Sequence, residues 1–96
     1  MPHPNVHQYL DASTAHLPAD LLQDLGAIDG VIAREFRDGW WLWVPEDVAG
    51  QLADYERLPT AIVTLWHFAR ARECNWVLLD ADAPEVDELP TYEHAR

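Results

Sequence analysis

The chain has 96 residues with 17 Asp and Glu, six Arg and no Lys, which gives a formal net charge of −11. This charge argues against binding to nucleic acids or anionic membranes, because both attract cationic surfaces. The length suits one domain, and hydrophobic residues make up 49% of the chain with 10% aromatic residues. A disordered acidic segment has fewer of both, so the acidity does not indicate disorder.

The single cysteine and the N-terminal residues indicate the cellular compartment of the protein. Cys74 is the only cysteine, which excludes an internal disulfide and a multi-cysteine zinc site. The first residues lack the basic and apolar regions of a signal peptide. No apolar run approaches the ~20 residues that a membrane span needs. We therefore expect a cytoplasmic protein without membrane contact.

The first predicted elements are a strand and a helix. Residues 1–7 carry two prolines and two histidines and are expected to be flexible. Residues 9–14 have a mixed pattern and form a short strand candidate. Pro18 suits the first turn of a helix, and Gly26 suits its end.

A hairpin is predicted next. Residues 31–36 form its first strand, residues 37–39 its turn, and the tryptophan-rich residues 40–44 its second strand. Because loop length sets the register of a hairpin, a three-residue turn predicts three facing pairs. These are Phe36 with Trp40, Arg34 with Leu42, and Ile32 with Val44.

The second half contains the strongest helix pattern. Residues 45–58 are acidic and irregular, with a short helical turn over residues 48–52. Residues 59–73 form a helix, since apolar residues recur at helical spacing at four positions: Ile62, Leu65, Trp66 and Ala69. Residues 76–79 form a short apolar strand, and the rest of the chain is acidic and loop-like.

The order β-α-β-β-α-β predicts an α+β fold in one domain spanning residues 1–96. A ferredoxin-like split βαβ sandwich fits this order. It has two layers, with one four-stranded, mainly antiparallel sheet and two helices on one face. Right-handed crossovers would place the first and last strands side by side in the middle of the sheet.

Trp41 and Trp43 are the first candidate binding residues. Strand alternation sends them to one face of the sheet and Trp40, Leu42 and Val44 to the other. Only one face can pack under the helices of a two-layer fold. The two indoles therefore form an exposed patch, or the acidic tail of residues 81–96 folds over them.

Carboxylates cluster in two segments. One cluster contains Glu46, Asp47, Asp54 and Glu56, and the other contains Asp80, Asp82, Glu85, Asp87, Glu88 and Glu93. Such clusters bind a basic partner surface or keep an aromatic-rich protein soluble. Asp80 and Asp82 are also candidate ligands for Mg²⁺ or Ca²⁺. One pair of carboxylates is a weak signal for such a site, and the glycine and terminal glutamate of an EF-hand loop are missing. No phosphate loop or nucleophile motif is present, so neither an enzyme nor a cofactor is expected.

Three segments carry a family resemblance: residues 13–18 (STAHLP), 68–80 (FARARECNWVLLD) and 86–92 (VDELPTY). Together they resemble a family of short uncharacterised bacterial proteins, a domain of unknown function found on plasmids, phages and integrated elements. The resemblance covers most of residues 9–92. It implies a genomic setting but no activity and no catalytic residues.

Charge and setting together suggest a function. The first hypothesis is a non-enzymatic inhibitor of a host defence enzyme, of the anti-CRISPR or anti-restriction type, that mimics DNA and binds a basic protein surface without binding nucleic acid itself. Its binding residues would be Trp41, Trp43, Glu46, Asp47, Asp80, Asp82, Glu85, Asp87 and Glu88. The alternatives are a homodimeric structural or regulatory module paired through Trp41 and Trp43, and a small metal-binding enzyme that uses Asp80, Asp82 and a histidine.

Overall fold

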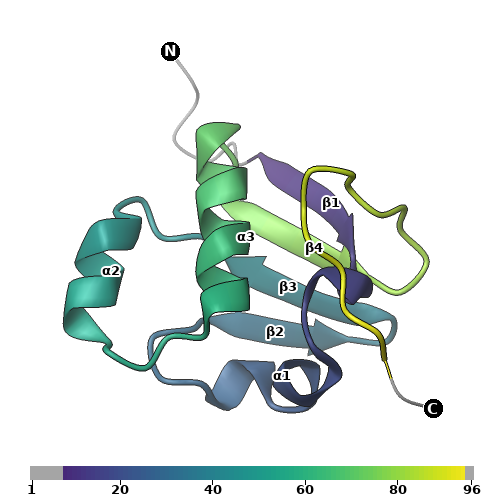
Figure 1. Cartoon of the computed structure of the whole chain (residues 1–96), viewed down its shortest axis with the longest axis horizontal. Helices are drawn as coiled ribbons and strands as arrows, with labels where there is room; N and C mark the ends of the chain where they lie inside the picture. Colours follow the sequence, from purple (N-terminus) through teal and green to yellow (C-terminus); the bar gives the residue numbers. More distant parts are fainter. Residues whose placement is uncertain (1–7, 95–96) are drawn as a thin grey trace.

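The computed structural model describes residues 8–94, so the expected flexibility of residues 1–7 lies outside the described residues. The chain is α+β, as predicted, and its elements follow the predicted order (Figure 1). The expected helical turn over residues 48–52 is a short α-helix, and two 3₁₀ helices (η) are added. In chain order they are β1 (Tyr9–Ser13), η1 (Thr14–His16), α1 (Ala19–Gln23), η2 (Leu25–Ala27), β2 (Ala33–Phe36), β3 (Gly39–Trp43), α2 (Val48–Asp54), α3 (Thr60–Ala71) and β4 (Trp76–Asp80). None of these helices is long and apolar enough to cross a bilayer.

The four strands form one mixed sheet in the order β1-β4-β3-β2. β1 runs parallel to β4, and the other two pairings are antiparallel. The first and last strands are neighbours as predicted, but β1 lies at the edge of the sheet and not in its middle. β1 exposes Tyr9 and Asp11, whereas β4 buries Val77 and Leu79, so β4 is better suited to a central position.

The register of the β2–β3 hairpin differs from the predicted one by one residue. Phe36 pairs with Gly39, so the loop contains two residues and not three, and Arg34 lies opposite Trp41. Gly39 belongs to the strand because it lies against the backbone of β4, where an added Cβ would collide with the carbonyl oxygen of Leu79. A shift of one residue moves each side chain to the other face, so Arg34 joins the face of Trp41.

Helix α3 lies across one face of the sheet and supplies much of the core (Figure 1). All four residues of its predicted apolar stripe are buried: Ile62, Leu65, Trp66 and Ala69. The indole Nε1 of Trp66 donates a hydrogen bond of 3.0 Å to the carbonyl oxygen of Trp43. Arg70 donates to the carbonyl oxygens of Val44 and Pro45 at 2.9 and 3.2 Å. These bonds fix α3 to the end of β3.

The C-terminal end of α3 contains a residue in the left-handed region. Glu73 has a φ of 60°, and Cys74 N–H donates to the carbonyl oxygen of Ala69 at 2.9 Å. This geometry ends many helices and favours glycine, because a Cβ is strained there.

Glu73→Gly is therefore expected to raise the free energy of unfolding by about 0.5–1 kcal/mol, since relief of Cβ strain exceeds the added entropy of the unfolded chain. Urea unfolding checks this value. Glu73→Ala removes the same charge but keeps the Cβ, so it should give no such gain. Equal stability of the two variants would contradict the proposed strain.

The C-terminal segment (residues 81–94) packs on the same side of the sheet as α3 (Figure 1). Leu89 is buried in the main core, and Tyr92 N–H donates to the carbonyl oxygen of Ala15 at 2.8 Å. The expectation that this segment could cover Trp41 and Trp43 is therefore wrong. Leu89 is buried in the core beside α3, and the burial of this side chain favours packing of the segment on the helix side.

Candidate functional site

The sheet face turned away from α3 carries most of the aromatic side chains of the strands. In one row across the sheet, Tyr9 pairs with Trp76 and Trp76 pairs with Trp43. Trp43 N–H then donates to the carbonyl oxygen of Ile32 at 2.9 Å, which continues the row beyond the start of β2. Tyr9 and Ile32 are each 54% exposed, and the two tryptophans are half-buried.

A second row on this face combines apolar and charged side chains. Asp11 pairs with Leu78, Leu78 with Trp41, and Trp41 with Arg34. Asp11 therefore lies on the edge strand β1, and Arg34 lies on the opposite edge strand β2. Both are exposed, and neither forms an ion pair with another residue in the described range 8–94. We call these two rows the open face.

On the open face, the ring of Trp41 contacts the rings of Tyr9 and Trp76 edge to face. The ring centroids of Tyr9 and Trp41 are 5.3 Å apart at 76°, and those of Trp41 and Trp76 are 6.4 Å apart at 88°. These are favourable geometries for aromatic pairs. Together with Arg34 the three rings line a shallow groove of about 470 Å³. The groove has an aromatic floor with one cationic side chain at its border.

The open face confirms the predicted alternation but contains residues that the sequence analysis missed. Trp41 and Trp43 lie on it, and no helix or loop within residues 8–94 covers it. Tyr9 and Trp76 were missed although alternation along their strands indicates their face. Arg34 was missed because the incorrect hairpin register assigned it to the covered face.

The predicted acidic residues do not form one site. Glu46 and Asp47 follow the end of β3 that lies beside Trp76, whereas Asp80 lies at the other end of the sheet, beside Gly39. Asp47 accepts a hydrogen bond of 3.0 Å from Gly50 N–H and caps α2. Glu85, Asp87 and Glu88 lie in the C-terminal segment on the helix side. One flat partner surface cannot contact these carboxylates and the open face together.

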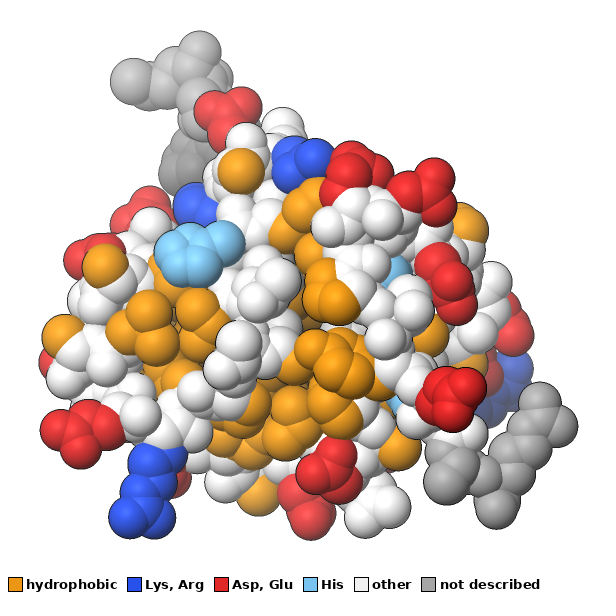
Figure 2. Space-filling view, viewed as in Figure 1, with side chains coloured by type: hydrophobic (Ala, Val, Ile, Leu, Met, Phe, Trp, Pro, Cys, Tyr) orange, Lys and Arg blue, Asp and Glu red, His pale blue; other side chains and the backbone are white. Residues whose placement is uncertain are grey.

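One stretch of the chain, residues 80–93, still carries six carboxylates. We call it the C-terminal acidic surface, and Figure 2 shows carboxylates along this margin of the helix-bearing face. It consists of Asp80, Asp82, Glu85, Asp87, Glu88 and Glu93. All except the half-buried Asp80 are exposed, and Asp80 accepts a hydrogen bond of 2.9 Å from Asp82 N–H.

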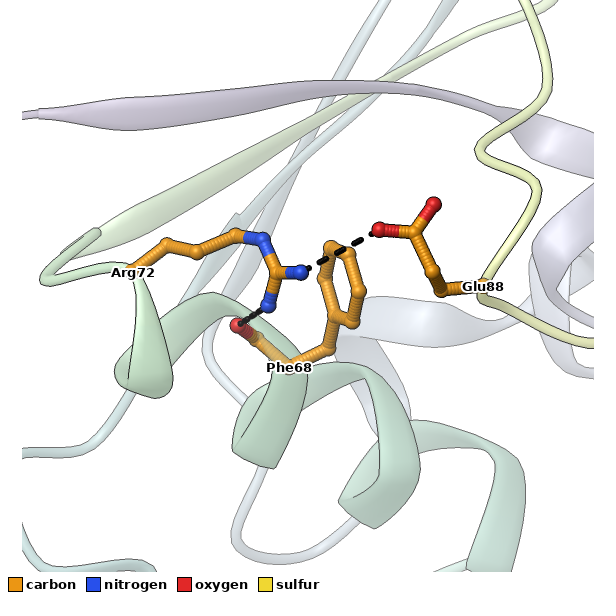
Figure 3. A network of polar contacts seen from close by, with 3 residues as sticks. All are labelled: Phe68, Arg72 and Glu88. Carbon is orange, nitrogen blue, oxygen red and sulfur yellow. Dashed lines mark hydrogen bonds and ion pairs between the residues drawn. The ribbon is translucent and has the colours of Figure 1, made fainter.

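One carboxylate of this surface is paired with an arginine. Arg72 donates to Glu88 at 3.3 Å, and its guanidinium carbon lies 3.5 Å from the centre of the Phe68 ring (Figure 3). The other ion pair within residues 8–94 joins Arg37 and Asp38. All 17 carboxylates lie in this range, so 17 − 2 = 15 of them have no ion-pair partner there. Most of the negative charge thus faces solvent.

A buried histidine holds the C-terminal segment in place. His16 is 2% exposed, and its Nδ1 lies 2.8 Å from the carbonyl oxygen of Pro90. Its Nε2 accepts a hydrogen bond of 2.8 Å from Val86 N–H. Since a carbonyl only accepts, Nδ1 carries the proton, and the ring is the neutral Nδ1–H tautomer. Both ring nitrogens are therefore occupied by backbone partners.

The residue types of metal or nucleophile chemistry have structural roles here. Ser13 accepts a hydrogen bond of 3.1 Å from Ala15 N–H, and Cys74 is buried. Within residues 8–94 no group of three or more His, Cys, Asp or Glu side chains is placed to hold a metal ion, and Asp80 and Asp82 stand without a third ligand.

Comparisons with known proteins identify a family. Neither a curated protein nor a solved structure matches the chain. The resemblance to a domain of unknown function is confirmed, since the model of the C-terminal domain of DUF5983 matches residues 9–94. The chain therefore belongs to DUF5983, a family of unknown function.

Proposed function

We propose that the protein is a non-catalytic interaction protein that uses the C-terminal acidic surface to bind a partner protein with a cationic surface. The observation that supports this proposal is the attachment of that surface to the core. Leu89 is buried, and His16 bonds to the backbone of Val86 and Pro90. Carboxylates on an anchored segment need little ordering when a partner binds, which favours affinity.

The lack of ion pairs at most of these carboxylates also supports a partner protein of positive charge. Of the six carboxylates in the C-terminal acidic surface, Glu88 has an arginine partner in the described part of the chain. The other five can pair with arginine or lysine side chains of another protein. The electrostatic field of several unpaired carboxylates speeds association with a protein of opposite charge.

A nucleic-acid-binding protein of a host defence system is the partner that we propose. Its lysine- and arginine-rich channel binds a polyanion, and a folded acidic protein can occupy the same channel. The protein would then act in the cytoplasm as an inhibitor encoded by a phage or other mobile element, of the anti-CRISPR or anti-restriction type. Its carboxylates would take the place of DNA phosphates.

Neutralising the C-terminal acidic surface is expected to abolish inhibition. The variant combines Asp82→Asn, Glu85→Gln, Asp87→Asn and Glu93→Gln. The matched control combines Asp29→Asn, Glu46→Gln, Asp54→Asn and Glu56→Gln, which lie away from the C-terminal segment. Each variant has a net charge of −11 + 4 = −7, so the two differ in the place of the charge and not in its total.

DNA cleavage by a purified guide-loaded CRISPR nuclease and by restriction endonucleases provides the measurement. We expect the first variant to inhibit at least about tenfold more weakly than the control, and wild-type binding to weaken as salt rises. Equal losses in both variants would show that net charge acts without a defined surface. Absence of inhibition across the panel, or binding insensitive to salt, would overturn the proposal.

A further inference from the structure

We propose that the open face binds a second copy of this chain and forms a two-fold symmetric, sheet-on-sheet dimer. The open face lies on the opposite side of the sheet from the C-terminal segment, which carries all of the C-terminal acidic surface except Asp80 at the end of β4. The dimer therefore does not depend on the proposed function, and each copy keeps its acidic surface free for another partner.

The order of side chains across the sheet is self-complementary. The second row reads Asp11, Leu78, Trp41, Arg34 from one edge to the other. A two-fold axis parallel to the strands, between the two facing sheets, exchanges the edges and keeps each row in register. Asp11 then faces Arg34 of the second copy, Arg34 faces its Asp11, and Leu78 faces its Trp41.

The aromatic row obeys the same symmetry. The axis places Trp76 opposite Trp43 of the second copy, and Tyr9 opposite its Ile32. Apolar side chains thus meet apolar side chains along the row. Both exposed edge residues, Tyr9 and Ile32, become covered. Sheets in β-sandwiches face one another in this way, with their strands about 30° apart and a core about 10 Å thick.

The charges of the open face favour a second copy over other partners. The face carries one exposed acid, Asp11, and one exposed base, Arg34, so it is not acidic like the rest of the molecule. A third charged residue, Asp80, lies at the end of the face and accepts from Asp82 N–H. A strongly cationic partner would meet Arg34 beside Trp41, whereas a second copy pairs Asp11 and Arg34 twice.

The size of the face indicates a dissociable dimer. Four strands about 4.8 Å apart and five residues about 3.3 Å apart give a footprint of roughly 300 Å² in projection. A stable interface buries about 800 Å² on each partner, so a face of this size supports a weak, transient dimer. Each copy also has a net charge of −11, and the resulting repulsion is screened by salt. We expect a weak dimer that is populated at high protein concentration and strengthens as salt rises.

Sedimentation of the full chain over a concentration series tests the dimer. Wild type should shift from the 11.0 kDa monomer toward twice that mass, and more so at high salt. Trp41→Ala should weaken the dimer at least about tenfold. Leu52→Ala, which truncates an exposed apolar side chain on α2, is the control and should leave it unchanged.

A charge exchange identifies the interface independently of Trp41. Arg34→Asp and Asp11→Arg should each weaken the dimer about tenfold, because like charges then face one another across it. The double variant restores opposite pairs and the net charge of −11, so it should dimerise like wild type. Circular dichroism and thermal unfolding verify the fold of each variant.

Two outcomes would overturn the dimer. One is a monomer at millimolar concentration and high salt. The other is a dimer that persists in Trp41→Ala and that the charge exchange neither weakens nor restores. The four-carboxylate variant of the C-terminal acidic surface should dimerise normally. Loss of inhibition in that variant and loss of dimerisation in the open-face variants are therefore separate results.

Discussion

Trp66→Ala is expected to lower the free energy of unfolding by about 3–5 kcal/mol, a large part of the stability of a small domain. Trp66 is the largest fully buried side chain, with 0% exposure, so its truncation leaves a large cavity between α3 and the sheet. The change also removes the donor to the carbonyl oxygen of Trp43. A buried acceptor without a partner adds to the cost.

Urea unfolding followed by circular dichroism measures this loss, and Trp41→Ala is the matched control. Trp41 undergoes the same chemical change on the open face, where it is half-buried, so we expect a loss of about 1 kcal/mol. Trp66→Phe separates the two contributions, because it keeps most of the ring volume and removes the N–H. Similar losses for Trp66→Ala and Trp41→Ala would show that the sheet face beneath α3 is not the main core.

His16→Ala is expected to lower the free energy of unfolding by about 2–4 kcal/mol and to release the C-terminal segment. The imidazole is the buried link between η1 and that segment, with hydrogen bonds of 2.8 Å to both Val86 and Pro90. Its removal leaves a backbone N–H and a carbonyl oxygen without partners and opens a cavity at a site that is 2% exposed.

Hydrogen exchange and limited proteolysis report on the C-terminal segment directly. Protection within residues 81–94 should fall in His16→Ala, whereas His67→Ala, at an exposed position of α3, should behave as wild type. Unchanged protection would show that the burial of Leu89 and the hydrogen bond from Tyr92 N–H to Ala15 anchor the segment without His16. Because His16→Ala alters no carboxylate, weaker inhibition in this variant would link the proposed function to the anchoring of the acidic surface and not to its charge.

The local sequence pattern was sufficient to predict several features of the structure. Apolar residues at helical spacing predicted the buried face of α3, and alternation predicted that Trp41 and Trp43 lie on the face away from Leu42. The order of elements predicted an α+β sandwich with its first and last strands adjacent. Each of these features depends on neighbours along the chain or on one chirality rule, and such information is present in a single sequence.

Contacts between distant residues decided the rest. Gly39 reads as a turn residue, but its contact with the backbone of Leu79 makes it part of β3 and shifts the register of β2. That shift carries Arg34 to the open face, where it lines the aromatic groove. A residue that is 40 positions away in the chain therefore determined the composition of the groove.

The candidate surfaces show the same division. The sequence by itself determined the charge of −11, the aromatic content, the helix α3 and the alternation that places Trp41 on the face away from Leu42. Only the tertiary structure decided that the C-terminal segment packs beside α3, that the acidic residues separate into distinct places, and that Asp11 and Arg34 lie at opposite edges of one row. The physical reason is that composition and periodicity are local, whereas the burial of Leu89, the bonds of His16 and the strand order depend on pairs that meet only in the folded chain.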